Sequence, residues 1–423
     1  MIAAVETTRL VSTGLLGCAL IAVLLIPGCG RRPGGPDEAL REEAARLARE
    51  LIIVDTHIDL PYRFAEKPED VSVRTAGGDF DYPRARAGGL DAAFMSIYVP
   101  ASYQEGGARE FADSLIDMVE TLARDRPGMF ALARSPDEVR ALAGGERVAL
   151  PMGMENGAPL GEDLGLLRHF FDRGIRYITL THSENNAICD SSYAKERRWS
   201  GLSPFGRRVV AEMNRLGIMI DVSHVSDETF RQVISLSRAP VIASHSSCRR
   251  FTPGWERNID DDMIRALAAK GGVVQINFGS AFLTDEARSQ SEAYYAALKE
   301  HMAREGLGEH DEGTKAFSKR YWEEHDRVYA DVKDVVDHID HVVRLAGAGH
   351  VGFGSDFEGV GDSLPAGLKD VSDYPNLILE MLRRGYSKED IRGICGENVL
   401  RVWSQVERVA RDLSAAPAGP DPS

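Results

Sequence analysis

Six apolar runs of this sequence end in side chains that can bind a metal ion or transfer a proton. The first run is followed by His57 and Asp59. Side chains two residues apart in a strand point to the same side, so an imidazole nitrogen and a carboxylate oxygen can reach one cation. A His-x-Asp triplet alone is weak evidence, because such triplets are common. The other five runs are followed by Glu155, His182, His224, His245 and Asp356.

The chain contains eight runs rich in apolar or β-branched residues, with helical patterns between them. The runs cover residues 51–55, 92–99, 148–154, 175–181, 218–222, 241–244, 273–278 and 351–355. Several are nearly continuous in apolar residues, which is typical of parallel strands buried on both faces. We therefore predict an α/β fold, a (β/α)8 TIM barrel. Strand ends converge at one face of such a barrel, so the six polar ends are expected to form one ring.

The segments between the runs predict the helices that surround the barrel. Apolar residues at helical spacing indicate helices over 111–124 and 262–270, and another from Pro204 to Gly217. A long, charged and mostly helical insertion covers 282–349, and a lid or a partner surface is its expected role. The remaining histidines lie away from strand ends and are predicted to be structural. They are His169, His301, His310, His325, His338, His341 and His350.

The composition is that of a globular protein, with 43% hydrophobic and 27% charged residues in a chain of 423. The formal net charge of −15 predicts repulsion of nucleic acid and of anionic lipid. Length and pattern suit one barrel domain over 51–405, followed by a partly disordered C-terminal tail over 406–423.

The N-terminal segment predicts export. Residues 10–26 are almost entirely apolar and lead into Ile26-Pro27-Gly28-Cys29, which resembles the signal peptide of a bacterial lipoprotein. Residues 1–28 would be cleaved, Cys29 lipidated, and 29–50 would form a tether and a leading helix. The alternative is an uncleaved signal anchor. Either way the body is expected in the bacterial cell envelope, held at a membrane. The other cysteines, Cys189, Cys248 and Cys395, are odd in number, so no disulfide is assigned.

Seven motifs stand in order along the chain. They are Asp55-Thr56-His57-Ile58-Asp59-Leu60-Pro61, Gly153-Met154-Glu155-Asn156-Gly157, Leu180-Thr181-His182-Ser183, Ile220-Asp221-Val222-Ser223-His224-Val225-Ser226, Ser244-His245-Ser246-Ser247, Arg257-Asn258-Ile259-Asp260-Asp261 and Gly352-Phe353-Gly354-Ser355-Asp356-Phe357-Glu358-Gly359. Together they resemble the motifs of the renal (membrane) dipeptidase family, the M19 metallopeptidases, from about residue 51 to about residue 405.

The resemblance implies a metal-dependent hydrolase of the amidohydrolase type that carries two Zn²⁺ per chain, cleaves dipeptides and forms a homodimer. His57 and Asp59 would bind one zinc ion, His224 and His245 the other, and Glu155 would bridge both. Nitrogen and oxygen ligands also accept cobalt or manganese, so the choice of zinc follows from the resemblance.

The resemblance also assigns three residues to the substrate. His182 would contact the scissile carbonyl or its oxyanion, Arg257 would hold the substrate carboxylate, and Asp356 would transfer protons. The residue types suit these roles. A water that bridges two metal ions loses its proton near neutral pH and becomes the nucleophile. Arginine presents a fork that matches a carboxylate, which favours a dipeptide with a free C-terminus.

Two positions depart from the family pattern. Ile58 stands where mammalian members have a polar residue, so the pocket for the N-terminal side of the substrate is expected to differ, and Glu184 stands where they have a cysteine. One alternative function is another amidohydrolase that acts on cyclic amides, lactones or phosphoesters. Many of those enzymes use His-x-His and a carbamylated lysine where this chain has Asp59 and Glu155. The other is a non-catalytic envelope lipoprotein, which would show gaps in the ligand set; the sequence has none.

Overall fold

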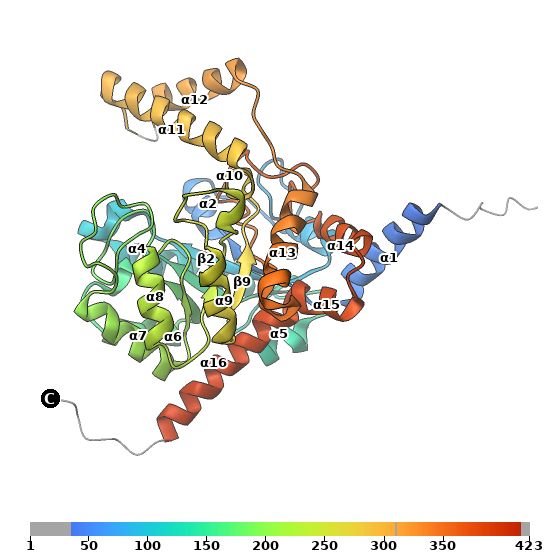
Figure 1. The fold of residues 1–423 in the computed structure, drawn as a ribbon, viewed down its shortest axis with the longest axis horizontal. Helices are drawn as coiled ribbons and strands as arrows, with labels where there is room; N and C mark the ends of the chain where they lie inside the picture. The colour runs from blue at the N-terminus through green and yellow to red at the C-terminus, as the bar shows by residue number, and fades with distance from the viewer. Residues whose placement is uncertain (1–34, 309–310, 416–423) are drawn as a thin grey trace, which may run out of the picture.

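The computed structural model describes residues 35–308 and 311–415. Eight parallel strands form a closed ring, because β1 pairs with both β10 and β2. In order around the ring the strands are β1 (Ile53–Ile58), β2 (Leu90–Tyr98), β5 (Met152–Glu155), β6 (Ile175–Thr179), β7 (Met219–Asp221), β8 (Ile242–Ala243), β9 (Val273–Ile276) and β10 (Val351–Phe353). The predicted (β/α)8 barrel is confirmed (Figure 1).

One predicted strand is wrong in its extent. The run 148–154 forms two strands, β4 (Val148–Leu150) and β5, with Pro151 between them. Proline has no N–H to donate, so the ladder breaks there, although the Pro151 carbonyl still accepts the amide of Met95. β4 pairs with β3 (Phe130–Leu132), a strand outside the ring that the sequence did not predict.

Helices cover the outside of the ring (Figure 1). The predicted helices are confirmed as α4 (Ala108–Asp125), α7 (Pro204–Leu216) and α9 (Asp261–Ala269), with Gly217 ending α7 in the left-handed conformation. The other surrounding helices are α1 (Pro36–Glu50), α2 (Leu60–Glu66), α3 (Tyr82–Gly88), α5 (Pro136–Leu142), α6 (Gly165–Asp172), α8 (Asp227–Leu236), α14 (Tyr374–Arg383) and α15 (Lys388–Arg392).

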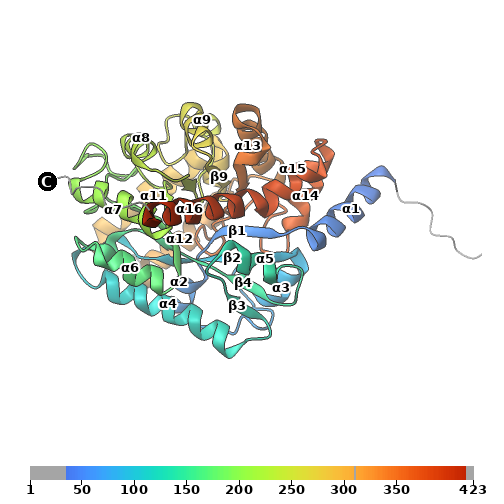
Figure 2. The same ribbon diagram turned by 90° about the horizontal axis from the view of Figure 1, so that it is seen from below.

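A C-terminal helix, α16 (Asn398–Ala415), closes one end of the barrel. Its Trp403 packs in one apolar cluster with Val54, Met219 and Ile242, which stand at the N-terminal ends of their strands. Figure 2 shows α16 crossing that end of the ring. The helix passes residue 405, where the sequence placed the end of the barrel domain, and buries Val406 and Ala410. The opposite end, at the carboxyl ends of the strands, is left for the site.

The segment between β9 and β10 contains helices that leave the barrel. After α10 (Ser280–Leu283), the helices α11 (Asp285–Glu305) and α12 (Glu312–Glu324) project together beyond the barrel (Figure 1). In α11 and α12 the buried residues are Ala287 and Thr314. By contrast, α13 (Val332–Ala346) packs against α9 and α14 as an ordinary barrel helix.

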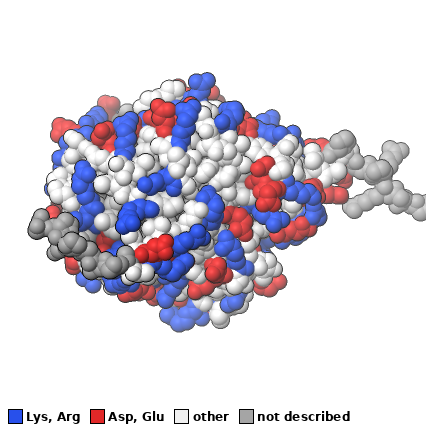
Figure 3. All heavy atoms as spheres, turned by 60° about the horizontal axis from the view of Figure 1, so that its bottom comes forward, with Lys and Arg blue, Asp and Glu red and all other residues white. Residues whose placement is uncertain are grey.

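Surface and cysteine features agree with a globular body. Acidic and basic side chains are interspersed on the face drawn in Figure 3. Cys189, Cys248 and Cys395 are buried and free, so no disulfide joins them. Across residues 35–308 and 311–415, no helix combines the length and apolar character needed to cross a membrane. The predicted signal peptide and Cys29 lie outside the described residues.

Candidate functional site

The first ligand pair depends on a bulge in β1. Asp55 pairs with Ala93 and Ile58 with Met95, so β1 holds one residue more than β2 across this interval. Asp55 accepts a hydrogen bond from Tyr374 of the outer helix α14, whereas His57 faces into the ring. The sequence indicated that His57 follows the first strand, but the structure places it within β1. Its Nε2 atom is 3.5 Å from Oδ2 of Asp59, at the start of α2.

Glu155, the last residue of β5, lies at the centre of the site. Its Oε2 atom is 3.4 Å from Nε2 of His57. Its Oε1 atom is 3.0 Å from Nε2 of His224 and 3.1 Å from Nε2 of His245. The two oxygens of one buried carboxylate thus face two different sets of imidazoles. The structure brings together all five residues predicted to bind metal.

The buried charges of the cluster determine its protonation. Burial favours a raised pKa for Glu155, but His57, His182 and the hydrogen bonds of His224 and His245 outweigh it and hold the pKa of that carboxyl well below its usual range. Burial lowers the pKa of His224 and His245 well below their usual value. Neutral imidazoles keep a nitrogen lone pair for a metal ion.

The donor atoms of the cluster fit a bound cation. Among the described residues, Nε2 of His57 and Oδ1 of Asp59 are buried with no hydrogen-bond partner. Such orphaned atoms are costly unless a ligand satisfies them. Three groups have ligand atoms within 4.8 Å of one another: His57, Glu155 and His245; Glu155, His182 and His224; and His57, Asp59 and Asp356. Nitrogen and oxygen donors of this kind suit a divalent metal. How the ligands divide between two ions stays a prediction.

His182 and Arg257, the predicted substrate residues, both touch this cluster. The His182 ring lies 4.2 Å from the His224 ring and 4.7 Å from the Tyr98 ring. Arg257 is buried, and its Nη2 atom is 2.9 Å from the His245 carbonyl oxygen and 3.0 Å from Nε2 of His224. An always-charged guanidinium in this position can attract an anionic group to the metal centre.

Asp356 completes the ring on the loop after β10. Burial, reinforced by the charges of Asp59 and Glu155, raises the pKa of Asp356 to about 7. Its Oδ2 atom accepts a hydrogen bond from Nδ2 of Asn277 at 2.7 Å. A carboxyl that titrates near neutral pH suits proton transfer. Asp356 and His224 both adopt positive φ, 63° and 68°, a strained backbone that often marks functional sites.

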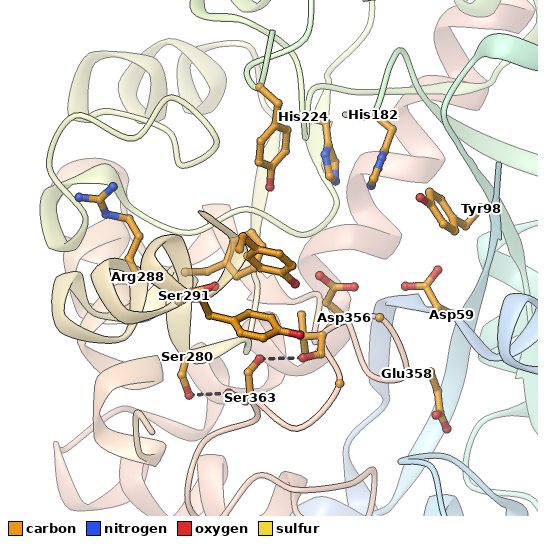
Figure 4. Close-up of a pocket in the computed structure, with 18 of the residues that line it drawn as sticks. Asp59, Tyr98, His182, His224, Ser280, Arg288, Ser291, Asp356, Glu358 and Ser363 are labelled. Atoms are coloured by element: carbon orange, nitrogen blue, oxygen red, sulfur yellow. Dashed lines mark hydrogen bonds between the residues drawn. The ribbon is translucent and has the colours of Figure 1, made fainter. Parts of the chain in front are cut away.

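The site opens into a cavity of about 1690 Å³. Figure 4 shows His182 and His224 on one side with Asp59 and Asp356 facing them. Residues of the projecting helices and the loop after them line the outer wall: Arg288, Ser291, Tyr294, Tyr295, Trp322 and Arg327. Ile58 is fully buried in the hydrophobic core and, like Arg257, does not line the cavity wall. Its effect on the substrate pocket stays a prediction.

Most other histidines have structural contacts. His338 of α13 accepts the amide of Cys248 and donates to the carbonyl of Leu283, which ties two loops to that helix. His169, His341 and His350 bond to Asp113, Asp261 and the Gly272 carbonyl. His301 and His325 stack on Phe317 and Tyr321 in the projecting helices. His310 lies outside the described residues.

Sequence reasoning missed three residues that form hydrogen bonds to the predicted site residues. Asn277 follows β9 and bonds to Asp356, but it lies within the predicted run 273–278, so it did not stand out as a residue that follows a strand. Tyr177 and Ser244 contact Nδ1 of His57 and of His245. They lie within predicted strands, and no spacing rule separates them from core residues.

Comparisons with known proteins agree with this geometry. The family model of the membrane dipeptidases, peptidase family M19, matches residues 41–417. Dipeptidase 3 of Rattus norvegicus is 33% identical over 382 residues, which cover 88% of this chain and 69% of the rat protein.

Two crystal structures extend the similarity to the fold. The probable dipeptidase PvdM from Pseudomonas aeruginosa matches with a TM-score of 0.76 and 30% identity, over 88% of this chain and 100% of that chain. A metallo peptidase from Rhodobacter sphaeroides, liganded with a phosphinate mimic of the dipeptide L-Ala-D-Ala, matches with a TM-score of 0.68 and 26% identity, over 84% and 99%. With these matches and a clustered set of metal-ligand residues, the chain belongs to the membrane dipeptidase family, peptidase family M19, and is a peptide hydrolase.

Proposed function

We propose that the protein is a zinc-dependent dipeptidase that cleaves dipeptides with a free C-terminal carboxylate. The observation that carries this proposal is the position of Glu155, which directs one oxygen to His57 and the other to His224 and His245. A shared carboxylate of this kind is what a two-metal hydrolytic site needs. The similarity to dipeptidases, one of them bound to a dipeptide mimic, supports the substrate class.

We assign two Zn²⁺ per chain to this cluster. His57 and Asp59 would hold one ion, His224 and His245 the other, with Glu155 shared between them. When bound, the ions would supply the water nucleophile that peptide hydrolysis requires near neutral pH. The chain's own residues do the rest. Arg257 attracts the substrate carboxylate, His182 stabilises the developing oxyanion, and Asp356 accepts a proton and returns it to the leaving amine.

A dipeptide panel tests this function. The purified full chain is loaded with zinc and assayed with L,L and L,D dipeptides beside a Glu155→Ala control. Turnover well above that control supports the proposal, and turnover equal to it contradicts the proposal. Elemental analysis that returns fewer than two metal ions per folded chain contradicts the binuclear assignment even where turnover is present.

Replacing Arg257 by Lys is expected to raise KM for dipeptides by about 10- to 100-fold, since a hydrogen bond to a charged group contributes ~1.5–3 kcal/mol. Lysine keeps the charge and loses the fork. The measurement compares a dipeptide with its C-terminal amide, which lacks the carboxylate. The variant should discriminate less between the two, because it keeps the charge but loses the bidentate contact. Arg250→Lys, at an exposed position on the same loop, is the matched control. An equal loss on both substrates would contradict carboxylate recognition.

Replacing Gly359 by Ala is expected to lower kcat/KM by up to about 10²-fold, the loss that a ~1 Å displacement causes. A Cβ at this position would lie 2.3 Å from Oδ1 of Asp356 and 2.3 Å from Oδ2 of Asp59, so both carboxylates must move. Kinetics and metal content are measured together. Gly349→Ala, just before β10, is the control, because a Cβ there meets open space and the backbone is not in the positive-φ region. Equal activity of the two variants would refute the steric argument.

We propose from the sequence that the protein is an exported lipoprotein of the cell envelope and a homodimer. Replacing Cys29 by Ala is expected to abolish lipid attachment, because lipidation requires the cysteine thiol. Incorporation of labelled fatty acid and membrane fractionation measure this, with Cys18→Ala as the control. Equal labelling of the Cys29 variant and the wild type would exclude Cys29 as the anchor. Sedimentation velocity tests the dimer.

A further inference from the structure

His245 belongs to a buried hydrogen-bond chain that ends on a carboxylate. Its Nδ1 atom lies 2.7 Å from Oγ of Ser244, and this hydroxyl lies 2.6 Å from Oδ2 of Asp221, the last residue of β7. All three side chains are at most 1% exposed. These hydrogen bonds lie on the Nδ1 side of the imidazole, whereas Glu155 faces its Nε2 atom.

The protons along this chain can be placed from its other contacts. Oδ1 of Asp221 accepts the amides of Ser223 and Ser244, and its Oδ2 accepts the hydroxyls of Thr179 and Ser244. A carboxylate only accepts, so Ser244 must give its single proton to Asp221. The lone pair of Ser244 then accepts Nδ1–H of His245. This leaves the lone pair of His245 on Nε2 for a metal ion. Oε1 of Glu155, 3.1 Å from Nε2, is the competing acceptor for the ring proton when no ion lies between them.

The other imidazoles of the cluster lack this arrangement. Nδ1 of His57 lies 2.9 Å from the hydroxyl of Tyr177, which in turn donates to the neutral carbonyl of Thr56. Within the described part of the chain, Nδ1 of His224 is buried and has no hydrogen-bond partner. Of these three imidazoles, His245 is therefore the one whose Nδ1 atom is connected to a carboxylate.

We propose that Asp221 is a positioning residue for the metal site: through Ser244 it fixes the Nδ1–H tautomer and the ring orientation of His245. This inference rests on the proposed function in that the fixed lone pair serves a metal ion. Partners behind a metal-binding histidine hold its tautomer and raise its basicity, and their loss typically lowers metal affinity by about 10- to 100-fold. Here a serine hydroxyl stands between the carboxylate and the imidazole.

The Asp221→Asn variant should reverse the donor and acceptor roles along the hydrogen bonds between residue 221, Ser244 and His245, while the side chain at 221 keeps its shape. The asparagine carbonyl can still accept the two backbone amides, but its NH₂ group must face Thr179 and Ser244 and donate to them. Ser244 then turns its proton toward Nδ1 of His245, which forces the imidazole proton onto Nε2 and blocks the metal-binding lone pair. In Ser244→Ala, Nδ1 merely loses its partner. Removing Ser244 should therefore relieve the defect of Asp221→Asn.

Two measurements on the full chain test this. Zinc affinity is measured by chelator competition. The imidazole tautomer of His245 is measured by ¹⁵N NMR of the zinc-free, histidine-labelled protein in a Glu155→Ala background, which removes the carboxylate acceptor on the Nε2 side of this ring. We expect Asp221→Asn to lose about 10- to 100-fold in affinity at one site, Ser244→Ala to lose less, and the double variant to match Ser244→Ala. In the Glu155→Ala background the zinc-free spectrum should show Nδ1–H with Asp221 present and Nε2–H with Asp221→Asn.

Matched controls separate positioning from folding. Asp91→Asn alters another buried carboxylate that holds two backbone amides, and Ser237→Ala removes another buried hydroxyl, both outside the site. Neither should change zinc affinity at equal thermal stability. Losses that add in the double variant, or an unchanged tautomer in Asp221→Asn, would overturn the proposal. The NMR measurement uses neither zinc nor substrate. It therefore tests the role of Asp221 even if the protein does not cleave dipeptides and the proposed function fails.

Discussion

A Glu155→Gln enzyme is expected to lose on the order of 10³-fold in kcat/KM for dipeptides. Metal ions contribute several kcal/mol to transition-state stabilisation, and each ~1.4 kcal/mol is tenfold in rate. Glutamine keeps the shape of the side chain but presents one oxygen and one NH₂ group. Because Glu155 turns one oxygen to His57 and the other to His224 and His245, an amide can serve only one side. The NH₂ group repels a cation on the other side.

Metal content and kinetics of this variant are measured on the same zinc-loaded preparation. We expect kcat/KM and the number of bound ions to fall together, while circular dichroism shows a folded barrel. Glu162→Gln, an exposed carboxylate beyond the same strand, is the matched control and should behave like the wild type. A Glu155→Gln protein with full metal content and full activity would show that Glu155 does not bridge.

An Asp356→Asn enzyme is expected to lose about 10²- to 10⁴-fold in kcat, the range for a general acid–base group. Asparagine can still accept the hydrogen bond from Asn277, but it cannot take up a proton. The wild-type rate should fall as pH drops through the pKa of Asp356, because the proton acceptor must be ionised. Burial raises that pKa to about 7, and nearby cations oppose the rise, so the acid limb is expected at or below pH 7.

The pH profile separates a proton-transfer role from a structural one. In the variant the acid limb assigned to Asp356 should vanish while bound metal stays at the wild-type level. Asp362→Asn, an exposed carboxylate on the same loop, should leave both unchanged. A variant that keeps the wild-type limb would exclude Asp356 as the proton acceptor. Loss of metal together with activity would make Asp356 a ligand, as its place beside His57 and Asp59 allows.

The fold class and the candidate metal and substrate residues could be predicted from the sequence, whereas the residues that support them could not. Strands buried on both faces leave nearly continuous apolar runs, and a polar residue that follows such a run stands at the carboxyl end of the barrel. His182, His224, His245 and Asp356 were found in this way, and the structure places them in one cluster with Glu155. Local sequence patterns are sufficient to find these residues, because each one lies within a few positions of the carboxyl end of its own strand.

Only the tertiary structure decided how these residues face one another. The bulge that turns His57 inward is a mismatch between β1 and β2, and the break at Pro151 depends on which strands lie beside β4 and β5. The two directions of the Glu155 oxygens and the chain from Asp221 to His245 join residues from different strands. The physical reason is that hydrogen bonds and side-chain directions are set by neighbours distant in sequence, which no run or spacing along one strand records.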